Sequence, residues 1–250
     1  MCNPASNYWP GKESRQGETM ELTTPDGSTM KVHISHPEGD GPAPMMLVIH
    51  DYFDPDDYYF DLADQYAAAG FAAVCPDLFH RHGDLSEQTH EKAGGRIGAV
   101  GDEEALADLD FVLEHLRAHG RLGELSVTGF CWGGRLAYIF AARHREVRNL
   151  VVMYGHLTAW SGPDGNKPYS PLEEAAKIDA RVIGSYGGAD GSIPLDQVAE
   201  MEKRLIEKGV RAELKVYDSA PHCFFRTPEW KQASDDVWSR VLEGLRPAGV

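Results

Sequence analysis

A thiol, a carboxylate and an imidazole each stand just after a strand-like run of the sequence. Cys131 lies in VTGFCWGGR, Asp190 in RVIGSYGGADGSIP and His222 in YDSAPHCFFRT. A thiol activated by a histidine is a nucleophile, and a carboxylate can complete such a triad. These residue types therefore predict nucleophilic catalysis by a Cys-Asp-His triad.

The segment around Cys131 has the pattern G-x-C-x-G-G, which predicts a sharp turn from strand to helix. Gly129 and Gly133 let the turn close without a Cβ clash, and Gly134 lets the helix pack close to the strand. The start of that helix is expected to lower the pKa of the thiol. A buried structural cysteine fits the same pattern. The order nucleophile, acid, histidine along the chain favours the catalytic interpretation.

The surrounding sequence predicts the elements that position these side chains. The expected strands are short and mostly apolar, and they are MELTT, MKVHISHP, MMLVIH, FAAVCPD, LSVTG, LVVMYG, RVIGSYG and AELKVYD. Helices are expected at residues 58–69, 102–119, 133–144, 172–177, 196–208 and 229–245. Strands alternating with helices after a hairpin predict an α/β fold, with a mostly parallel sheet of about eight strands and helices on both faces. In such sheets, chemistry gathers at the carboxyl ends of the strands.

Length, charge and cysteine content restrict the possible domain number, partners and compartment of the protein. The chain of 250 residues is expected to form one domain over 1–250, with an irregular N-terminal arm at 1–18. A net charge of −15 argues against nucleic-acid partners and against binding to anionic membranes. No apolar run approaches the ~20 residues that span a bilayer, and the first residues lack the apolar core of a secretory signal. The four cysteines have no short repeated spacing, so we expect reduced thiols in the cytoplasm.

Other candidate sites are weaker, and no cofactor or metal is expected. His80, Arg81 and His82 cluster, but no third ligand has the spacing of a metal site. Cys223 adjoins His222, although neighbours at a strand end tend to point apart. The segment from 81 to 101 lacks a core pattern and is expected to be a surface excursion near the site.

The sequence resembles the dienelactone hydrolase family, whose members have an α/β-hydrolase fold and a Cys-Asp-His triad. The resemblance runs from about residue 45 to the last helix and rests on VIHDYF, AAVCPDLFHR, VTGFCWGGRLA, GGADGSIP and APHCFFRT. It implies that Cys131 is the nucleophile, that His222 is the general base and that Asp190 orients His222.

The resemblance also implies roles around the triad. The backbone N–H groups of Tyr52 and Trp132 would form an oxyanion hole, and Arg81 and Arg226 would hold a substrate carboxylate. The family commonly has a glutamate in an EIFG-like motif that helps to deprotonate the thiol. This chain has DYFD instead, so Asp51 takes that position with a shorter side chain.

A cysteine nucleophile restricts the reaction. A thiolate leaves a tetrahedral intermediate more easily than an alkoxide does, so attack on a simple alkyl ester tends to reverse. A cysteine nucleophile therefore suits enol esters, aryl esters and thioesters, whose leaving groups are good. The sequence therefore predicts a cofactor-free hydrolase that opens an activated lactone or ester, expected to be a small anionic molecule, through a thioester. A broader carboxylesterase or thioesterase, with incidental arginines, stays open as an alternative. So does a non-catalytic binding protein that retains the pocket.

Overall fold

Eight strands form one sheet in the part of the chain that the computed structural model describes, which is residues 17–39, 41–55, 57–85, 87, 89–118, 122–162 and 164–245. The strands are β1 (Glu18–Thr23), β2 (Thr29–Ser35), β3 (Ala43–Ile49), β4 (Ala72–Pro76), β5 (Leu122–Phe130), β6 (Val147–Met153), β7 (Arg181–Gly187) and β8 (Ala212–Tyr217). Their order across the sheet is β1-β2-β4-β3-β5-β6-β7-β8. The pairs β1–β2 and β2–β4 are antiparallel and the others are parallel. The carboxyl ends of β3, β5, β6, β7 and β8 therefore meet at one edge.

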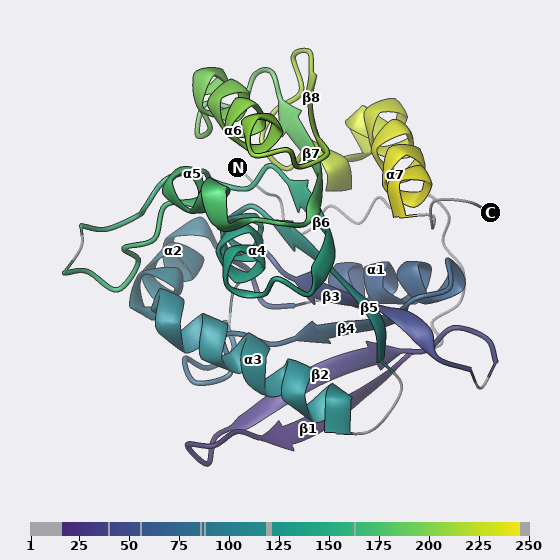
Figure 1. Cartoon of the computed structure of the whole chain (residues 1–250). Helices are drawn as coiled ribbons and strands as arrows, with labels where there is room; N and C mark the ends of the chain where they lie inside the picture. Colours follow the sequence, from purple (N-terminus) through teal and green to yellow (C-terminus); the bar gives the residue numbers. More distant parts are fainter. Residues whose placement is uncertain are drawn as a thin grey trace.

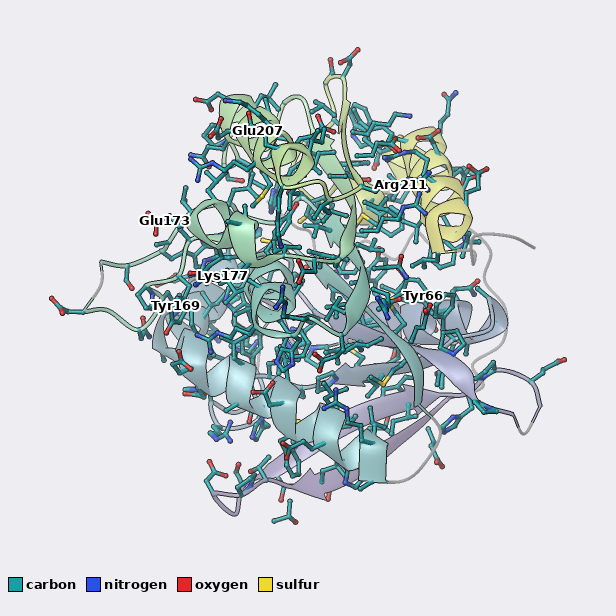
Figure 2. The ribbon with its side chains drawn as sticks, in the orientation of Figure 1. Tyr66, Tyr169, Glu173, Lys177, Glu207 and Arg211 are labelled. Carbon is teal, nitrogen blue, oxygen red and sulfur yellow. The ribbon has the colours of Figure 1, made fainter. Side chains whose placement is uncertain are left out.

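Helices cover both faces of this sheet, as the sequence predicts (Figure 1). They are α1 (Asp57–Ala68), α2 (His90–Ala99), α3 (Asp102–Ala118), α4 (Trp132–Arg143), α5 (Pro171–Glu174), α6 (Leu195–Glu207) and α7 (Lys231–Leu245). Short 3-10 turns are η1 (Ala175–Lys177), η2 (Phe224–Arg226) and η3 (Pro228–Trp230). Helices α1 and α7 share a face, because the ring of Tyr66 (labelled in Figure 2) packs edge-on against Trp238 with centroids 5.0 Å apart. The predicted fold class is confirmed.

Helix α2 was not predicted. It lies inside the segment from 81 to 101, which has no hydrophobic core pattern. Thr89 caps it by accepting a hydrogen bond from the backbone N–H of Lys92 at 3.3 Å. The helix buries Arg96, whose guanidinium pairs with Asp54 and lies 4.1 Å above the ring of Phe79. Hydrophobic periodicity does not detect this helix because much of what it buries is a charged side chain held by a carboxylate and a ring.

Two expectations concern the chain's start and its thiols. The predicted arm at 1–18 lies outside the described residues except for Gly17 and Glu18, and Glu18 begins β1. Cys75 and Cys131 are free, whereas Cys223 is disulfide-bonded, so the expectation of reduced thiols is wrong for Cys223. Within the described ranges, every helix is too short or too polar to cross a membrane.

Candidate active site

Cys131 occupies the turn between β5 and α4 in a backbone conformation that side chains rarely adopt. Its φ is 53° and its ψ is −113°. A Cβ atom on Gly133 would lie 2.1 Å from the carbonyl oxygen of His50, so only glycine lets α4 begin this close to the end of β3. The backbone N–H of Cys131 donates to the carbonyl of Met153 at 3.0 Å. Such strain, about 1–3 kcal/mol, persists only where surrounding contacts enforce it, and it is common at functional residues.

The structure brings the three predicted triad residues together from three strand ends. Nε2 of His222 lies 3.1 Å from Sγ of Cys131, and Nδ1 of the same ring lies 2.5 Å from Oδ2 of Asp190. The other carboxylate oxygen of Asp190 accepts hydrogen bonds from the backbone N–H and the hydroxyl of Ser192, at 2.8 and 2.6 Å. The imidazole is therefore held between an anchored carboxylate and the thiol.

The surroundings of the Cys131 thiol disfavour its deprotonation. Burial and the charge of Asp51 raise the pKa of Cys131, although a hydrogen bond from the backbone N–H of Trp132 acts in the opposite direction. The expected lowering by the helix start is therefore outweighed, because the sulfur lies in an apolar site beside a carboxylate. Burial also acts to raise the pKa of Asp190, but its hydrogen bonds from His222 and Ser192 keep that pKa below its usual value.

Asp51 and Arg226 form a fully buried ion pair near the thiol. Each is 1% exposed, and Nη1 of Arg226 lies 3.4 Å from Oδ2 of Asp51. The guanidinium carbon lies 4.3 Å from the centre of the Tyr58 ring. The backbone N–H of Phe53 donates to the other oxygen of Asp51 at 3.0 Å. Asp51 is thus positioned to influence the thiol electrostatically, whereas Arg226 is enclosed.

Arg81 is engaged elsewhere. Its Nε donates to Asp26 at 2.5 Å and its Nη1 donates to Asp108 at 2.6 Å, so it ties the β1–β2 turn to α3. The structure does not bring Arg81 and Arg226 to the wall of the pocket beside the triad.

That pocket has a volume of about 300 Å³ at the carboxyl edge of the sheet. It is lined by Tyr52, His90, Gly94, Ile97, Cys131, His156, Trp160, Ser192 and His222. The lining residues include no lysine or arginine among the described residues. Tyr52 lines this pocket, while Trp132 is 1% exposed and its ring stacks on Phe79 with centroids 5.1 Å apart. The oxyanion-hole role of their backbone N–H groups stays a prediction.

His156 is a residue of the site that the sequence interpretation missed. It follows the carboxyl end of β6, and its ring centroid lies 5.7 Å from that of His222 and 4.9 Å from that of Trp160. Burial and the neighbouring His222 lower the pKa of His156 to about 4, so this ring is neutral at pH 7. The rule that found Asp190, a polar residue directly after a strand, would have found His156 as well.

Helix α2 supplies part of the pocket wall, so the segment from 81 to 101 lies near the site as expected, although its helical structure was not predicted. The hydroxyl of Tyr52 hydrogen-bonds to the ring of His90, and Gly94 and Ile97 continue the wall. These contacts join segments far apart in the chain, so spacing alone could not reveal them.

Comparisons with known proteins agree with this architecture. The model of the dienelactone hydrolase family matches residues 30–249. The chain is 33% identical to an inferred carboxymethylenebutenolidase of Escherichia coli strain K12 over 89% of this chain and 84% of that protein. It is 29% identical to the carboxymethylenebutenolidase of Rhodococcus opacus, covering 85% and 83%. The crystal structure of an inferred dienelactone hydrolase from Klebsiella pneumoniae superposes with a TM-score of 0.82 at 31% identity, covering 91% of this chain and 97% of that one.

Proposed function

Because this chain belongs to the dienelactone hydrolase family of enzymes that act on lactones and esters, we propose that it works through a Cys131-Asp190-His222 triad and a thioester acyl-enzyme. One observation carries the proposal. Sγ of Cys131 lies 3.1 Å from Nε2 of His222, whose other nitrogen lies 2.5 Å from Asp190. These contacts have the geometry that proton transfer from a nucleophile to an oriented base requires.

The proposed reaction has two halves. His222 takes the thiol proton as Sγ of Cys131 attacks the carbonyl carbon, and the N–H groups of Tyr52 and Trp132 stabilise the oxyanion. The tetrahedral intermediate collapses, the enolate or phenolate leaves, and it receives the proton from His222. For a lactone, this leaving group stays attached to the acyl chain. Water then gives a proton to His222, attacks the thioester and releases the acid, and Cys131 recovers its proton.

Asp51 and Arg226 give an anionic substrate a specific route to activation. A substrate carboxylate that pairs with Arg226 would release Asp51 from its ion pair. In this route the freed carboxylate of Asp51 takes the proton of Cys131 in place of His222 and returns it to the thiolate once the thioester is hydrolysed. The enolate then receives the proton that His222 takes from the attacking water. Because Arg226 is enclosed, this exchange requires the ion pair to open. Arg81 would assist only by giving up Asp26 or Asp108.

A neutral ester is the second candidate substrate. It is favoured by a pocket wall without lysine or arginine among the described residues. Aryl and enol esters would fit such a wall through apolar contacts with Ile97 and Trp160 and would need no cation. In that case Arg226 serves only as the partner of Asp51.

The nucleophile is tested by rapid quenching after mixing with an aryl acetate, followed by intact-mass and peptide analysis. An acetyl group on Cys131 supports the thioester, and turnover without any adduct, or with an adduct elsewhere, contradicts it.

The substrate class is tested by kcat/KM for a carboxylated lactone and for a neutral aryl acetate, in the parent enzyme and in Arg226→Lys and Arg81→Ala. Loss of a desolvated arginine–carboxylate contact typically costs about 2–5 kcal/mol, more than tenfold in kcat/KM. Selective loss on the anionic lactone supports the clamp, and melting curves show whether a variant is still folded. Equal rates on both substrates in all three proteins favour the general esterase.

A further inference from the structure

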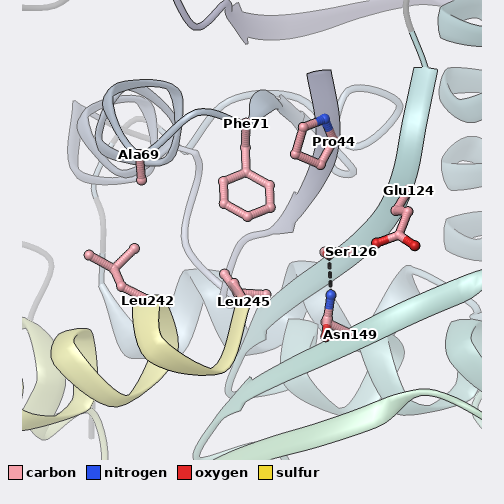
Figure 3. A pocket seen from close by; sticks show the side chains of 8 residues that line it. All are labelled: Pro44, Ala69, Phe71, Glu124, Ser126, Asn149, Leu242 and Leu245. Carbon is pink, nitrogen blue, oxygen red and sulfur yellow. Dashed lines mark hydrogen bonds between the residues drawn. The ribbon is translucent and has the colours of Figure 1, made fainter. Parts of the chain in front are cut away.

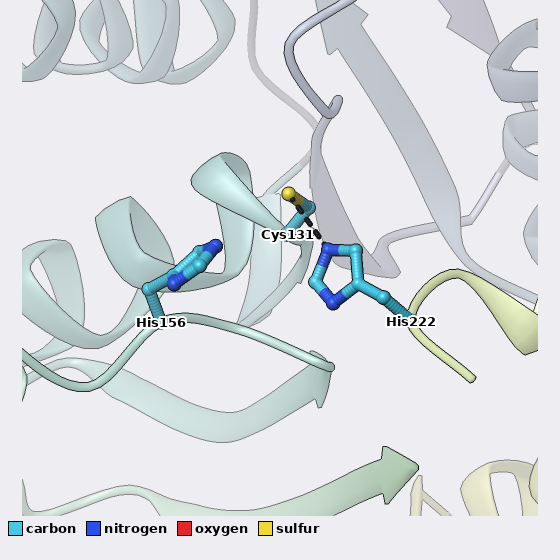
Figure 4. Close-up of side chains that lie close together, drawn as sticks. All are labelled: Cys131, His156 and His222. Atoms are coloured by element: carbon cyan, nitrogen blue, oxygen red, sulfur yellow. Dashed lines mark hydrogen bonds between the residues drawn. The ribbon is translucent and has the colours of Figure 1, made fainter. Parts of the chain in front are cut away.

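Three potential metal ligands converge at the active site. The ligand atoms of Cys131, His156 and His222 all lie within 4.8 Å of one another, and Figure 4 shows the three side chains close together. We propose that these residues form a binding site for zinc or a similar divalent ion, and that the ion switches the hydrolase off. Binding depends only on the cluster, whereas the loss of activity rests on the proposed function.

The donor set suits this class of ion. Zinc prefers thiolate and imidazole ligands, at about 2.3 Å for sulfur and about 2.0 Å for nitrogen, which places tetrahedral ligands roughly 3.2–3.6 Å apart. The separation of 3.1 Å between Sγ of Cys131 and Nε2 of His222 is already close to this range. His156 needs to approach by about 1 Å, which a small rotation of its side chain can supply.

The support around the cluster resembles that of metal sites. Nδ1 of His222 is held by Asp190 at 2.5 Å, which directs Nε2 toward the thiol. Metal-bound histidines usually have such a carboxylate partner, which fixes their orientation and raises their basicity.

The backbone also brings His156 close to the turn between β5 and α4 that holds Cys131. A Cβ atom on Gly155 would lie 2.7 Å from the carbonyl carbon of Gly134, so two glycines allow β6 to end against the first turn of α4. This close approach sets His156 beside Cys131 and His222. The fourth tetrahedral position faces the pocket, where water or a buffer anion can complete the coordination.

Ion binding and catalysis compete for the same atoms. The ion bonds to Sγ of Cys131, whose proton leaves to solvent, and to Nε2 of His222, which then has no lone pair for a proton. No electron is transferred. The nucleophile and base are both occupied, so we expect stoichiometric and reversible inhibition.

The test uses Co²⁺ as a spectroscopic probe on chelator-treated, reduced full-length protein. A thiolate bonded to Co²⁺ gives a sulfur-to-cobalt charge-transfer band, and competition with Zn²⁺ then gives the zinc affinity. We expect one ion per chain and no band in Cys131→Ala. Affinity should fall at least about 100-fold in His156→Ala and about 10–100-fold in Asp190→Asn, since loss of a partner behind a ligand typically has the latter effect.

His90→Ala is the matched control, because His90 lines the same pocket but lies outside the cluster. Its Co²⁺ and Zn²⁺ affinities should stay within about twofold of the parent. A band that survives in Cys131→Ala, or an affinity that His156→Ala leaves unchanged, would overturn the site. Zinc that binds to the cluster but leaves ester hydrolysis intact would overturn the inhibition alone. A protein that binds zinc but hydrolyses no ester at all when metal-free would count against the proposed function instead.

Discussion

Two hollows of nearly equal volume lie at opposite edges of the sheet, and their linings differ. The pocket at the carboxyl edge measures about 300 Å³, and the hollow at the amino edge measures about 320 Å³. The second hollow lies between α1, α7 and the first residues of β3, β5 and β6 (Figure 3). It is lined by Pro44, Ala69, Phe71, Glu124, Ser126, Asn149, Leu242 and Leu245. Volume therefore does not distinguish the candidate active site from the second hollow.

The difference lies in how the polar groups are arranged. At the amino edge, the amide of Asn149 donates to the hydroxyl of Ser126 at 3.0 Å, and neither group is a nucleophile or a base at pH 7. At the carboxyl edge, the thiol of Cys131 faces an imidazole and sits on a strained turn. One edge of the sheet therefore holds the strained turn and the thiol–imidazole pair, and we expect the other edge to serve packing.

The largest expected effect comes from removing the thiol of Cys131, the proposed nucleophile at the carboxyl edge. Cys131→Ala should lower kcat for an activated ester by at least about three orders of magnitude, because the acyl-enzyme can no longer form. Stopped-flow kinetics should also lose any burst of acylation. Retention of more than a tenth of the parent kcat would contradict the assignment of Cys131.

The next largest effect is expected at Asp190, whose carboxylate contacts His222, the proposed base. Asp190→Asn should lower kcat by roughly 10²–10⁴, since the amide can hold His222 in the wrong tautomer while the fold stays intact. The measurement is kcat alongside the melting temperature. Ser192→Ala is the milder companion, because it removes one of the hydrogen bonds to Asp190 and leaves the carboxylate in place. If both variants keep the parent kcat, Asp190 does not orient His222.

The fold was predictable because the sequence patterns that indicate its strands and helices are local. Alternating apolar runs and helical stripes predicted the sheet, and the strand-end rule predicted that Cys131, Asp190 and His222 meet. Helix α2 was missed because a buried Arg96, paired with Asp54, does not count as apolar in a periodicity argument.

The site was predictable only in part, because burial and pairing depend on distant segments. The sequence suggested a thiol of lowered pKa, but the degree of burial and the place of Asp51 emerge only in three dimensions. The resemblance suggested that Arg81 contacts substrate, whereas Asp26 and Asp108 engage it. The sequence does not single out His156, because a lone histidine after a strand gains significance only once His222 and Trp160 are known to lie beside it.

A matched pair of alanine substitutions, one at each edge of the sheet, separates stability from activity. Phe71 and Ile97 are both 7% exposed and each lines its own hollow. Phe71→Ala should lower the free energy of unfolding by about 3 kcal/mol through lost burial and an enlarged cavity, and leave kcat/KM within about twofold. Ile97→Ala should lower both stability and kcat/KM. Urea unfolding and ester kinetics measure the two quantities, and a large loss of activity in Phe71→Ala would contradict the division between the edges.

Lowering the pH should reduce the free energy of unfolding through His156. Burial and His222 lower the pKa of His156 to about 4 from a usual value of 6.5, while Asp190 acts in the opposite direction and Arg135 adds to the lowering. Between these two pH values the unfolded chain binds the proton and the folded protein does not, so stability falls as the pH falls. This ring should contribute about 2–3 kcal/mol to the loss from pH 7 to pH 4.

His156→Gln separates this contribution from those of other groups. Burial also lowers the pKa of His50, but that residue is present in both proteins and cancels in the difference. The lowered pKa of Asp190 acts mainly below pH 4, because its usual value is 3.8. Chemical unfolding at pH 7 and at pH 4 should therefore show a smaller acid loss in the variant. Equal losses would mean that His156 takes up its proton in the folded state.

The smallest expected effect comes from a substitution at the amino end of β6. It tests whether a change at that end of the strand alters activity at the carboxyl end. Asn149 lies near the start of β6 and His156 follows its end, so β6 is the direct route between the hollows. Asn149→Ala removes the 3.0 Å hydrogen bond to Ser126, which should cost about 0.5–1.5 kcal/mol of stability. A double-mutant cycle with Ser126→Ala should give a coupling of the same size. We expect kcat/KM to stay within about twofold, because the parallel pairing of β6 with β5 and β7 holds the strand in register. A tenfold change in kcat/KM without loss of fold would show that β6 transmits changes from the amino edge to the turn around Cys131. The two hollows would then have to be treated as one coupled unit.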